Sequence, residues 1–256
     1  MQTKQLMVTE LNIEHLPLVM GLQSKIIANL DKDEKHFILE RSVEDFMRAL
    51  SNGNTHMIGV FDGDKLIAQS MFDFPQAGQN RDLSEFAGET GNEDLVIYKA
   101  TLVDVDYRGR GLMQKLLAYR EAKARAAGKT TAISQIAVDN PASWINALKN
   151  GMSIRKVDHD PEDQAKVLYM RKDFYDLPHI PAAGEGFSMR IGQDIKKEIP
   201  ALFNKMRYFA ARGYYGVGFD RRDNSIVWAK AGGRTENEAL NRRIVLLGVQ
   251  GKTIRI

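Results

Sequence analysis

The stretch that decides the fold runs from Leu102 to Met113 and reads LVDVDYRGRGLM. Its aliphatic start completes a segment from Leu95 to Val105 that is rich in β-branched residues, which we expect to be a central strand. Gly109 and Gly111 follow closely, and Leu112 to Ala127 then carries apolar residues at helical spacing. The sequence therefore predicts a strand, a glycine loop and a helix in immediate succession.

This succession predicts a binding site for an anion. The first turn of a helix has backbone N–H groups without acceptors, and the helix dipole is positive there. Gly109 and Gly111 let the backbone approach a phosphate without a Cβ in the way, while Arg108 and Arg110 add positive charge. A Walker loop is excluded because Gly-Lys-Ser/Thr is missing, and a dinucleotide fingerprint is excluded because it needs a third glycine at Gln114.

The elements around the loop predict a sheet flanked by helices. Ser42, with acidic residues after it, is typical of a helix N-cap, and Asn140 and Pro141 together predict the start of a short helix. Gly63 lies in an Asp-Gly-Asp sequence that suits a tight hairpin turn. We expect helices at 13–30, 42–52 and 140–151, and strands at 56–61, 65–72, 130–139, 154–158 and 166–173.

The segment from Leu102 to Met113 resembles the cofactor motif of the GNAT superfamily of N-acetyltransferases, in which Arg/Gln-x-x-Gly-x-Gly/Ala follows an aliphatic strand. Arg108 and Gly111 match this motif, and Met113 stands where glycine or alanine is usual. Asn140, with Gly151 eleven residues later, resembles the family's Asn…Gly-Phe sequence, and the order of elements through residue 175 is also similar. The resemblance implies an α/β (α+β) fold with a mixed, mostly antiparallel sheet flanked by helices.

The resemblance also implies how acetyl-CoA, or another acyl-CoA, binds as cosubstrate. In the family, loop amides hold the CoA pyrophosphate, and strand amides hold the pantetheine arm where two neighbouring strands diverge. An asparagine at the position of Asn140 commonly contacts the CoA arm, although a helix N-cap explains this residue equally well. The residues implied to bind the cofactor are Leu102, Val103, Arg108, Gly109, Arg110, Gly111, Leu112, Met113 and Asn140.

The reaction implied by the resemblance is direct attack of a deprotonated amine on the acyl thioester, without a covalent enzyme intermediate. The family often uses a tyrosine seven residues after the asparagine as general acid, and here that position is Ala147. Tyr98, Lys99, Asp94 and Ser143 are weak substitutes, so the catalytic residues stay unassigned. We therefore expect an N-acetyltransferase that acts on an amine of a small molecule, peptide or protein, with a CoA-binding protein without catalysis as the alternative.

The charge distribution separates a C-terminal part from the rest. Residues 1–183 contain 22 lysines and arginines against 26 aspartates and glutamates, a net charge of −4, whereas residues 184–256 contain 14 against 7, a net charge of +7. The region 176–187 is rich in proline and glycine and is the predicted linker. We expect an acyl-CoA-binding domain at 1–175 and a small basic α+β domain at 188–256, with helices at 194–212 and 236–247 and a hairpin at 214–219 and 225–229.

A second resemblance lies in the C-terminal part, where the sequence RGYYGVGF is similar to the strand motif of RNA-recognition domains. Tyr215 stands where glycine or alanine is expected, and Gly216 stands where an aromatic residue is expected. Nucleic-acid binding is therefore disfavoured. The alternatives for the aromatic residues are packing of the small domain, a wall of a substrate pocket, or a homodimer surface. The matching residues are Arg212, Gly213, Tyr214, Val217 and Phe219.

Composition narrows the remaining function classes. The chain has no cysteine, which removes disulfides, thiolate nucleophiles and Cys-based zinc sites. Its five histidines are scattered, so no metal site is expected. There is no apolar run of membrane-spanning length and no secretory leader pattern. We expect a cytoplasmic protein without a membrane partner.

Overall fold

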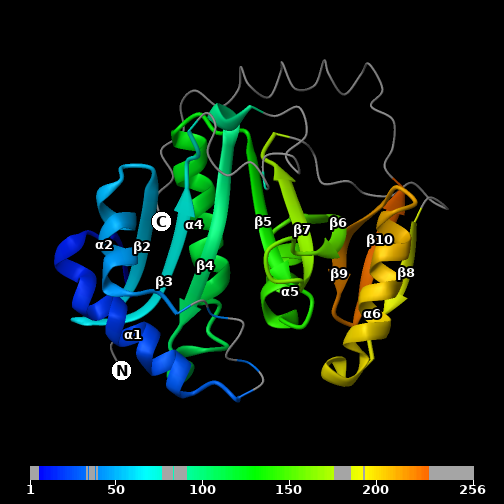
Figure 1. Cartoon of the computed structure of the whole chain (residues 1–256), viewed down its shortest axis with the longest axis horizontal. Helices are drawn as coiled ribbons and strands as arrows, with labels where there is room; N and C mark the ends of the chain where they lie inside the picture. The colour runs from blue at the N-terminus through cyan, green and yellow to red at the C-terminus, as the bar shows by residue number, and fades with distance from the viewer. Residues whose placement is uncertain are drawn as a thin grey trace.

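A single sheet is the framework of the molecule. The computed structural model describes residues 6–32, 34, 38, 40–76, 83, 91–175, 186–192 and 194–230. This part of the chain forms a ten-stranded sheet in the order β1-β2-β3-β4-β5-β7-β6-β9-β10-β8 (Figure 1). The strands are β1 Met7–Glu10, β2 Thr55–Asp62, β3 Lys65–Asp73, β4 Leu95–Val103, β5 Thr131–Ala137, β6 Ser153–His159, β7 Lys166–Asp173, β8 Gly186–Arg190, β9 Tyr214–Asp220 and β10 Ser225–Lys230. The α-helices are α1 Leu16–Ala28, α2 Val43–Ser51, α4 Leu112–Ala126, α5 Pro141–Lys149 and α6 Ile195–Ala210, and the short 3-10 helices are η1 Ile13–His15, η3 Asn92–Asp94 and η4 Val105–Tyr107.

The strand directions agree with the fold class that the resemblance implies. β4 and β5 run parallel, and the other paired strands run antiparallel. The predicted mixed, mostly antiparallel sheet flanked by helices is therefore confirmed. The expected strand, glycine loop and helix are also present, as β4, the loop with η4, and α4.

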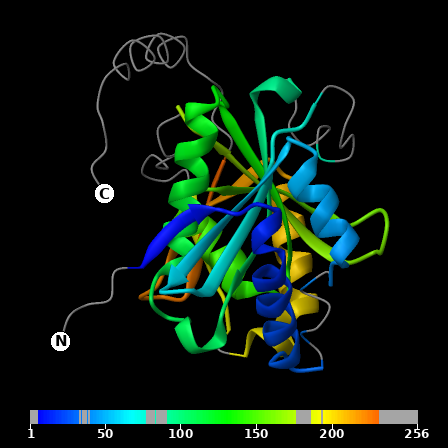
Figure 2. The ribbon, with the colours of Figure 1, turned by 90° about the vertical axis from the view of Figure 1, so that its left-hand side faces the viewer.

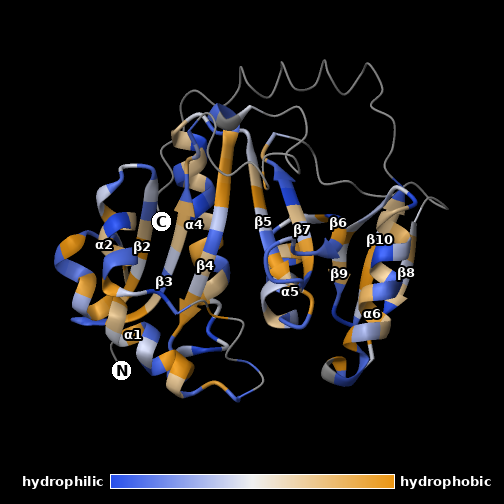
Figure 3. Cartoon of the chain, in the orientation of Figure 1, coloured by the Kyte–Doolittle hydropathy of each residue, from blue (hydrophilic) through white to orange (hydrophobic). Residues whose placement is uncertain are grey.

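Helices cover the two faces of the sheet with separate apolar cores. Neighbouring residues of one strand, such as Met57 and Ile58, belong to different cores because successive side chains of a strand point to opposite faces. One core joins the sheet to α4, α5 and α6, and the other joins it to α1 and α2. Figure 2 shows α4 on the opposite side of the strands from α1 and α2, and Figure 3 shows apolar residues along β4 and β5.

Local sequence signals define the predicted helix starts and the hairpin. Ser42 Oγ accepts a hydrogen bond from the Asp45 amide at 3.1 Å, and the Asp45 carboxylate accepts one from the Ser42 amide, which completes a capping box for α2. Asn140 caps α5 through a hydrogen bond from the Ser143 amide to Oδ1 at 3.2 Å. Gly63 turns the β2–β3 hairpin with a φ of 61°.

The C-terminal strands extend the same sheet. β9 lies beside β6, where Gly216 pairs with Ile154, and a Cβ at Gly216 would lie 2.9 Å from the Ile154 side chain. Glycine at 216 therefore permits this close approach. β8 begins at Gly186, so the last two residues of the predicted linker belong to a strand. Residues 176–185 and the predicted helix 236–247 lie outside the described residues, and the division into domains at 175 and 188 stays a prediction.

The aromatic residues that resemble an RNA-recognition strand lie on β9 and contact neighbouring elements. Phe219 packs edge-on against Trp144 of α5 with ring centroids 6.5 Å apart, and Tyr214 packs against Phe187 of β8 at 5.5 Å. The Arg155 guanidinium lies 4.2 Å from the centroid of the Tyr215 ring. These contacts favour the packing interpretation over nucleic-acid binding.

None of the helices in the described ranges combines the length and apolarity that crossing a membrane requires.

Candidate functional site

The glycine loop leads directly into the first turn of α4. Gly109 and Gly111 have φ angles of 75° and 74°, a left-handed conformation that glycine adopts without steric strain. Gly111 is the N-cap of α4, and the Lys115 amide donates a hydrogen bond to its carbonyl at 3.1 Å. The amides of Leu112 and Met113 therefore have no acceptor within the helix and are available to a bound anion.

The side chains of the loop leave this group of amides open. Arg108 and Arg110 are exposed, and Arg110 donates a hydrogen bond to the Asp106 carbonyl at 3.1 Å. Its guanidinium lies 4.7 Å from the centroid of the Tyr107 ring. Met113 is half-buried and packs against the core under α4, so its side chain does not cover the loop. Both positive charges and the free amides thus lie at one end of α4.

Asp104 connects the loop to α1 and β3. It is fully buried, and its Oδ1 accepts hydrogen bonds from Lys25 Nζ of α1 at 2.7 Å and from the Asp106 amide at 3.1 Å. Its Oδ2 lies 2.9 Å from Lys65 Nζ of β3. Burial by itself raises the pKa of Asp104, but the hydrogen bonds from the two lysines outweigh it and lower the pKa to about 2. Asp104 is therefore ionised at neutral pH and holds the start of the loop in place.

A second contact ties the loop to the β2–β3 hairpin. The Tyr107 hydroxyl donates a hydrogen bond to Asp62 Oδ2 at 2.8 Å, and this bond raises the pKa of Tyr107. Lys65 Nζ lies 4.9 Å from the centroid of the same ring. The loop is thus positioned by β2, β3 and α1 before any ligand binds.

The strands β4 and β5 separate beside this loop. Their parallel ladder has three residue pairs and ends at Ile97 and Ile133, although both strands continue (Figure 1). β4 also contains a bulge, because Ser70 pairs with Thr101 while Phe72 pairs with Tyr98. One edge of β4 therefore loses its neighbouring strand between the bulge and the glycine loop.

The direction of each β4 amide follows from the pairing with β3. The Asp104 amide donates to the Ile67 carbonyl at 2.8 Å. Hydrogen-bonding groups alternate between the two edges of a strand, so the Leu102 amide also faces β3, whereas the amides of Thr101 and Val103 face the edge that β5 leaves.

A buried arginine lies against the bulge of β4. Arg120 of α4 is 2% exposed and donates hydrogen bonds from one terminal nitrogen to the carbonyls of Lys99 at 3.2 Å and Met71 at 3.4 Å. Its guanidinium lies 4.2 Å from the centroid of the Tyr98 ring, and its Nε has no hydrogen-bond partner. Burial lowers the pKa of Arg120 to about 10, so it remains charged at neutral pH. It connects α4, β3 and β4 at the point where β4 departs from regular pairing.

The residues considered for acid catalysis are buried or already have a partner. Tyr98 is 3% exposed beneath Arg120, and burial raises its pKa far above the usual range. Lys99 forms an ion pair with Asp73. Ala147 is buried in the core and supplies no proton, while Oδ1 of Asn140 is occupied by its role as N-cap.

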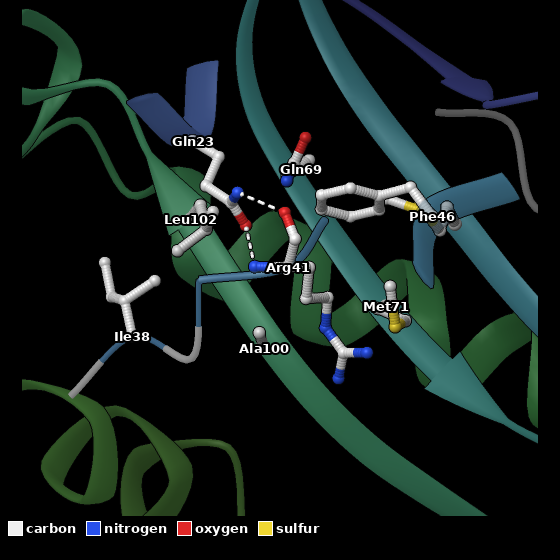
Figure 4. A pocket seen from close by; sticks show the side chains of 9 residues that line it. Gln23, Ile38, Arg41, Phe46, Gln69, Met71, Ala100 and Leu102 are labelled. Atoms are coloured by element: carbon white, nitrogen blue, oxygen red, sulfur yellow. Dashed lines mark hydrogen bonds between the residues drawn. The ribbon is translucent and has the colours of Figure 1, made fainter. Parts of the chain in front are cut away.

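A pocket lies on the opposite face of β4 from Arg120, between the sheet and the segment that joins α1 to α2 (Figure 4). The empty volume of about 290 Å³ includes space that is open to solvent. The walls are Gln23, Ile38, Arg41, Phe46, Met57, Gln69, Met71, Ala100 and Leu102. Ala100 and Leu102 follow the bulge of β4, so the pocket borders the strand segment that carries the free edge.

Three buried polar residues near the site were not predicted from the sequence, although their sequence positions carried a signal. Arg120 lies four residues after Leu116 and four before Ala124, and all three are buried on one side of α4. A charged residue within an apolar helical stripe was the available signal. Asp104 is an acid that follows an aliphatic strand, and Gln69 is a buried polar residue within β3. The partners of Arg120 and Asp104 come from distant parts of the chain and could not be identified from local patterns.

The model of the acetyltransferase (GNAT) family matches residues 25–152, which is half of the chain. No curated protein matches.

Solved acetyltransferases share the fold. A probable acetyltransferase from Staphylococcus epidermidis is 14% identical with a TM-score of 0.52, over 66% of this chain and 99% of that one. A putative acetyltransferase from Salmonella typhimurium with its cofactor acetyl-CoA is 13% identical with a TM-score of 0.51, over 70% of this chain and 99% of that one. An N-acetyltransferase from Staphylococcus aureus is 12% identical with a TM-score of 0.52, over 67% of this chain and 99% of that one. With the glycine loop, the diverging strands and the family match in agreement, this chain belongs to the acetyltransferase (GNAT) family.

Proposed function

We propose that the protein transfers an acetyl group from acetyl-CoA to an amine. The observation that carries the proposal is the glycine loop at the start of α4, which adjoins the free edge of β4 where β5 diverges. Anion-binding amides and an unpaired strand edge suit the two halves of CoA, its pyrophosphate and its amide-containing pantetheine arm. The likeness to the Salmonella typhimurium structure with its cofactor acetyl-CoA supports this assignment.

We assign the pyrophosphate to the amides from Gly109 to Met113, with Arg108 and Arg110 as counter-charges. Strand alternation assigns the pantetheine arm to the amides of Thr101 and Val103, since the Leu102 amide faces β3. Asn140 has its Oδ1 committed to the helix cap, so a contact with the arm falls to its Nδ2.

In the proposed reaction the amine nitrogen forms a bond to the thioester carbonyl carbon and the C–S bond breaks. The electron pair goes to sulfur, and the proton lost by the amine ends on the CoA thiol, directly or through water. Strand N–H groups beside the bulge polarise the carbonyl. Because Ala147 supplies no general acid, a CoA-binding protein without catalysis is the second candidate function.

The first experiment is a thermal shift with acetyl-CoA. A ligand at one hundred times its Kd adds about 2.7 kcal/mol to the free energy of unfolding, which corresponds to a rise in Tm of roughly 5–10 °C for a chain of this size. Release of free CoA thiol in the presence of an amine panel then distinguishes an enzyme from a binding protein. The proposal fails if acetyl-CoA gives no shift and CoA does not compete with it.

Gly111→Ala is expected to weaken acetyl-CoA binding about tenfold or more. The left-handed φ of 74° is strained for alanine, and a Cβ at this position intrudes on the space where the backbone approaches phosphate. Gly128, at the other end of α4, has a φ of 75° and open space around it. Gly128→Ala is therefore a matched control that loses a similar stability, about 1 kcal/mol, without losing affinity. Equal affinity losses in titrations of the two variants would contradict the assignment.

A further inference from the structure

The short helix α5 carries Asn140 at its N-terminus, so the position of this residue depends on how α5 is packed. A helix of nine residues is not stable by itself in water, and its place in the fold is set by its contacts. Helix α5 contacts both α4 and β9, and it lies between them in Figure 1. The contact with β9 comes from the C-terminal part of the chain, to which the proposed function assigns no role.

Phe219 of β9 makes an aromatic contact with α5. Its ring packs edge-on against Trp144 with centroids 6.5 Å apart, and Lys149 Nζ lies 5.2 Å from the centroid of the same ring. The strand β9 is itself held by its pairing with β10 and, at Gly216, with β6. Phe219 therefore connects α5 to a part of the sheet that is fixed by backbone pairing.

Trp144 links this contact to the start of α5. It is fully buried, and its Nε1 donates a hydrogen bond to the Val138 carbonyl at 3.0 Å. Val138 and Asn140 belong to the connection between the end of β5 and the first residue of α5. A shift of Trp144 would move the Val138 carbonyl, and with it the connection that holds Asn140.

The contact of α5 with α4 lies at the phosphate-binding turn. Gln114 Nε2 donates hydrogen bonds to the carbonyl and to Oδ1 of Asn146, both at 3.0 Å. Gln114 directly follows Leu112 and Met113, whose amides are assigned to the pyrophosphate. Helix α5 is thus attached to the turn that precedes the cofactor on α4 and to β9 of the C-terminal part.

We propose that Phe219 is a positioning residue for the cofactor arm, and that the C-terminal unit (residues 186–230) holds α5 in place. This inference rests on the proposed function, in which Nδ2 of Asn140 contacts the pantetheine arm. Phe219 acts on Asn140 through Trp144 and Val138, and not by contact with the ligand. Its loss therefore weakens binding of the arm and leaves binding of the pyrophosphate unaltered.

The test compares Phe219→Leu with Phe187→Leu in titrations of the full chain with acetyl-CoA. Both side chains are half-buried in the C-terminal unit, but the ring of Phe187 packs against Phe209 and Tyr214. We expect Phe219→Leu to weaken acetyl-CoA binding about fivefold, which is the effect of an aromatic pair, and Phe187→Leu to leave it unchanged. Phe219→Tyr keeps the ring and should retain the wild-type affinity.

A second ligand separates the arm from the pyrophosphate. Phosphoadenosine diphosphate is the nucleotide half of CoA, which has a pyrophosphate and no pantetheine arm, and it should bind to all of these variants equally. Asn140→Ser completes a double-mutant cycle, because serine caps a helix as well as asparagine does but has no Nδ2. In the Asn140→Ser background, Phe219→Leu should cause no further loss of affinity for acetyl-CoA, since both substitutions act on one contact.

Three results overturn the inference. They are equal affinity losses in Phe219→Leu and Phe187→Leu, a loss in Phe219→Leu that extends to phosphoadenosine diphosphate, and additive losses in the double variant. Each would mean that Phe219 contributes to folding and not to the position of Asn140. Absence of acetyl-CoA binding by the wild type contradicts the proposed function itself, and the inference then fails with it.

Discussion

Asp104→Asn is expected to lower the free energy of unfolding by about 2–3 kcal/mol and to weaken acetyl-CoA binding about tenfold. The substitution keeps the shape of the side chain but removes the charge shared by Lys25 and Lys65. Breaking a fully buried ion pair costs about 3–5 kcal/mol, and the loss is smaller here because the lysine side chains are 35% and 49% exposed and regain water. The loop then has to be ordered when the cofactor binds, which reduces affinity.

The control for this substitution is Asp106→Asn. Asp106 pairs with the same lysine at 2.5 Å, but its side chain is 64% exposed, and exposed ion pairs contribute about 0–1 kcal/mol. Urea unfolding measures both stabilities, and a titration with acetyl-CoA measures both affinities. Equal stability losses in the two variants would show that the buried position of Asp104 has no special role.

The stability due to Asp104 should also depend on pH. Its pKa in the folded protein is about 2, below the ordinary value of 3.8, so the unfolded chain binds more protons at this site between these two values. The contribution of the carboxylate is therefore fully present above about pH 5 and is lost as the pH falls through about 2. Unfolding of the wild type and of Asp104→Asn at several pH values should show their difference in stability shrinking over this window.

The predictions that succeeded rest on interactions between residues close in sequence. Ser42 and Asp45 lie three residues apart and define the start of α2 by themselves, and the glycines at 109 and 111 define the loop before α4. Alternation and helical spacing are also local, so the central strand and its following helix could be predicted within two residues of their observed ends.

The features that could not be predicted depend on contacts between distant segments. The bulge of β4 appears only through its register with β3, and Asp104 acquires its role from Lys25, which is 79 residues away in sequence. Pairing of β6 with β9 likewise depends on how two parts of the chain meet, although Gly216 in a run of aromatic residues marks the place. Local patterns carry no information about such partners.

Arg120→Ala is expected to lower the free energy of unfolding by about 3–5 kcal/mol. The substitution leaves a cavity under β4, and it removes the donor from the carbonyls of Lys99 and Met71. A domain typically has only 5–15 kcal/mol of stability, so the yield of folded protein should fall. A second variant is therefore needed to measure the effect of Arg120 on the site.

Arg120→Met retains most of the side-chain volume and removes the buried charge together with its hydrogen bonds. Relief of an unpaired buried charge offsets part of the lost bonding, so we expect a stability change below about 1.5 kcal/mol. The bulge of β4 loses its only charged donor among the described contacts, and the strand amides that face the CoA arm lose their fixed positions. KM for acetyl-CoA should rise about tenfold while the circular dichroism spectrum stays unchanged.

Lys123→Met, which removes a surface ion pair of the same helix with Glu10, is the control and should leave KM unaltered. A wild-type KM in Arg120→Met would mean that the bulge holds its shape without this arginine, and that the separation of β4 from β5 is set by the strands alone.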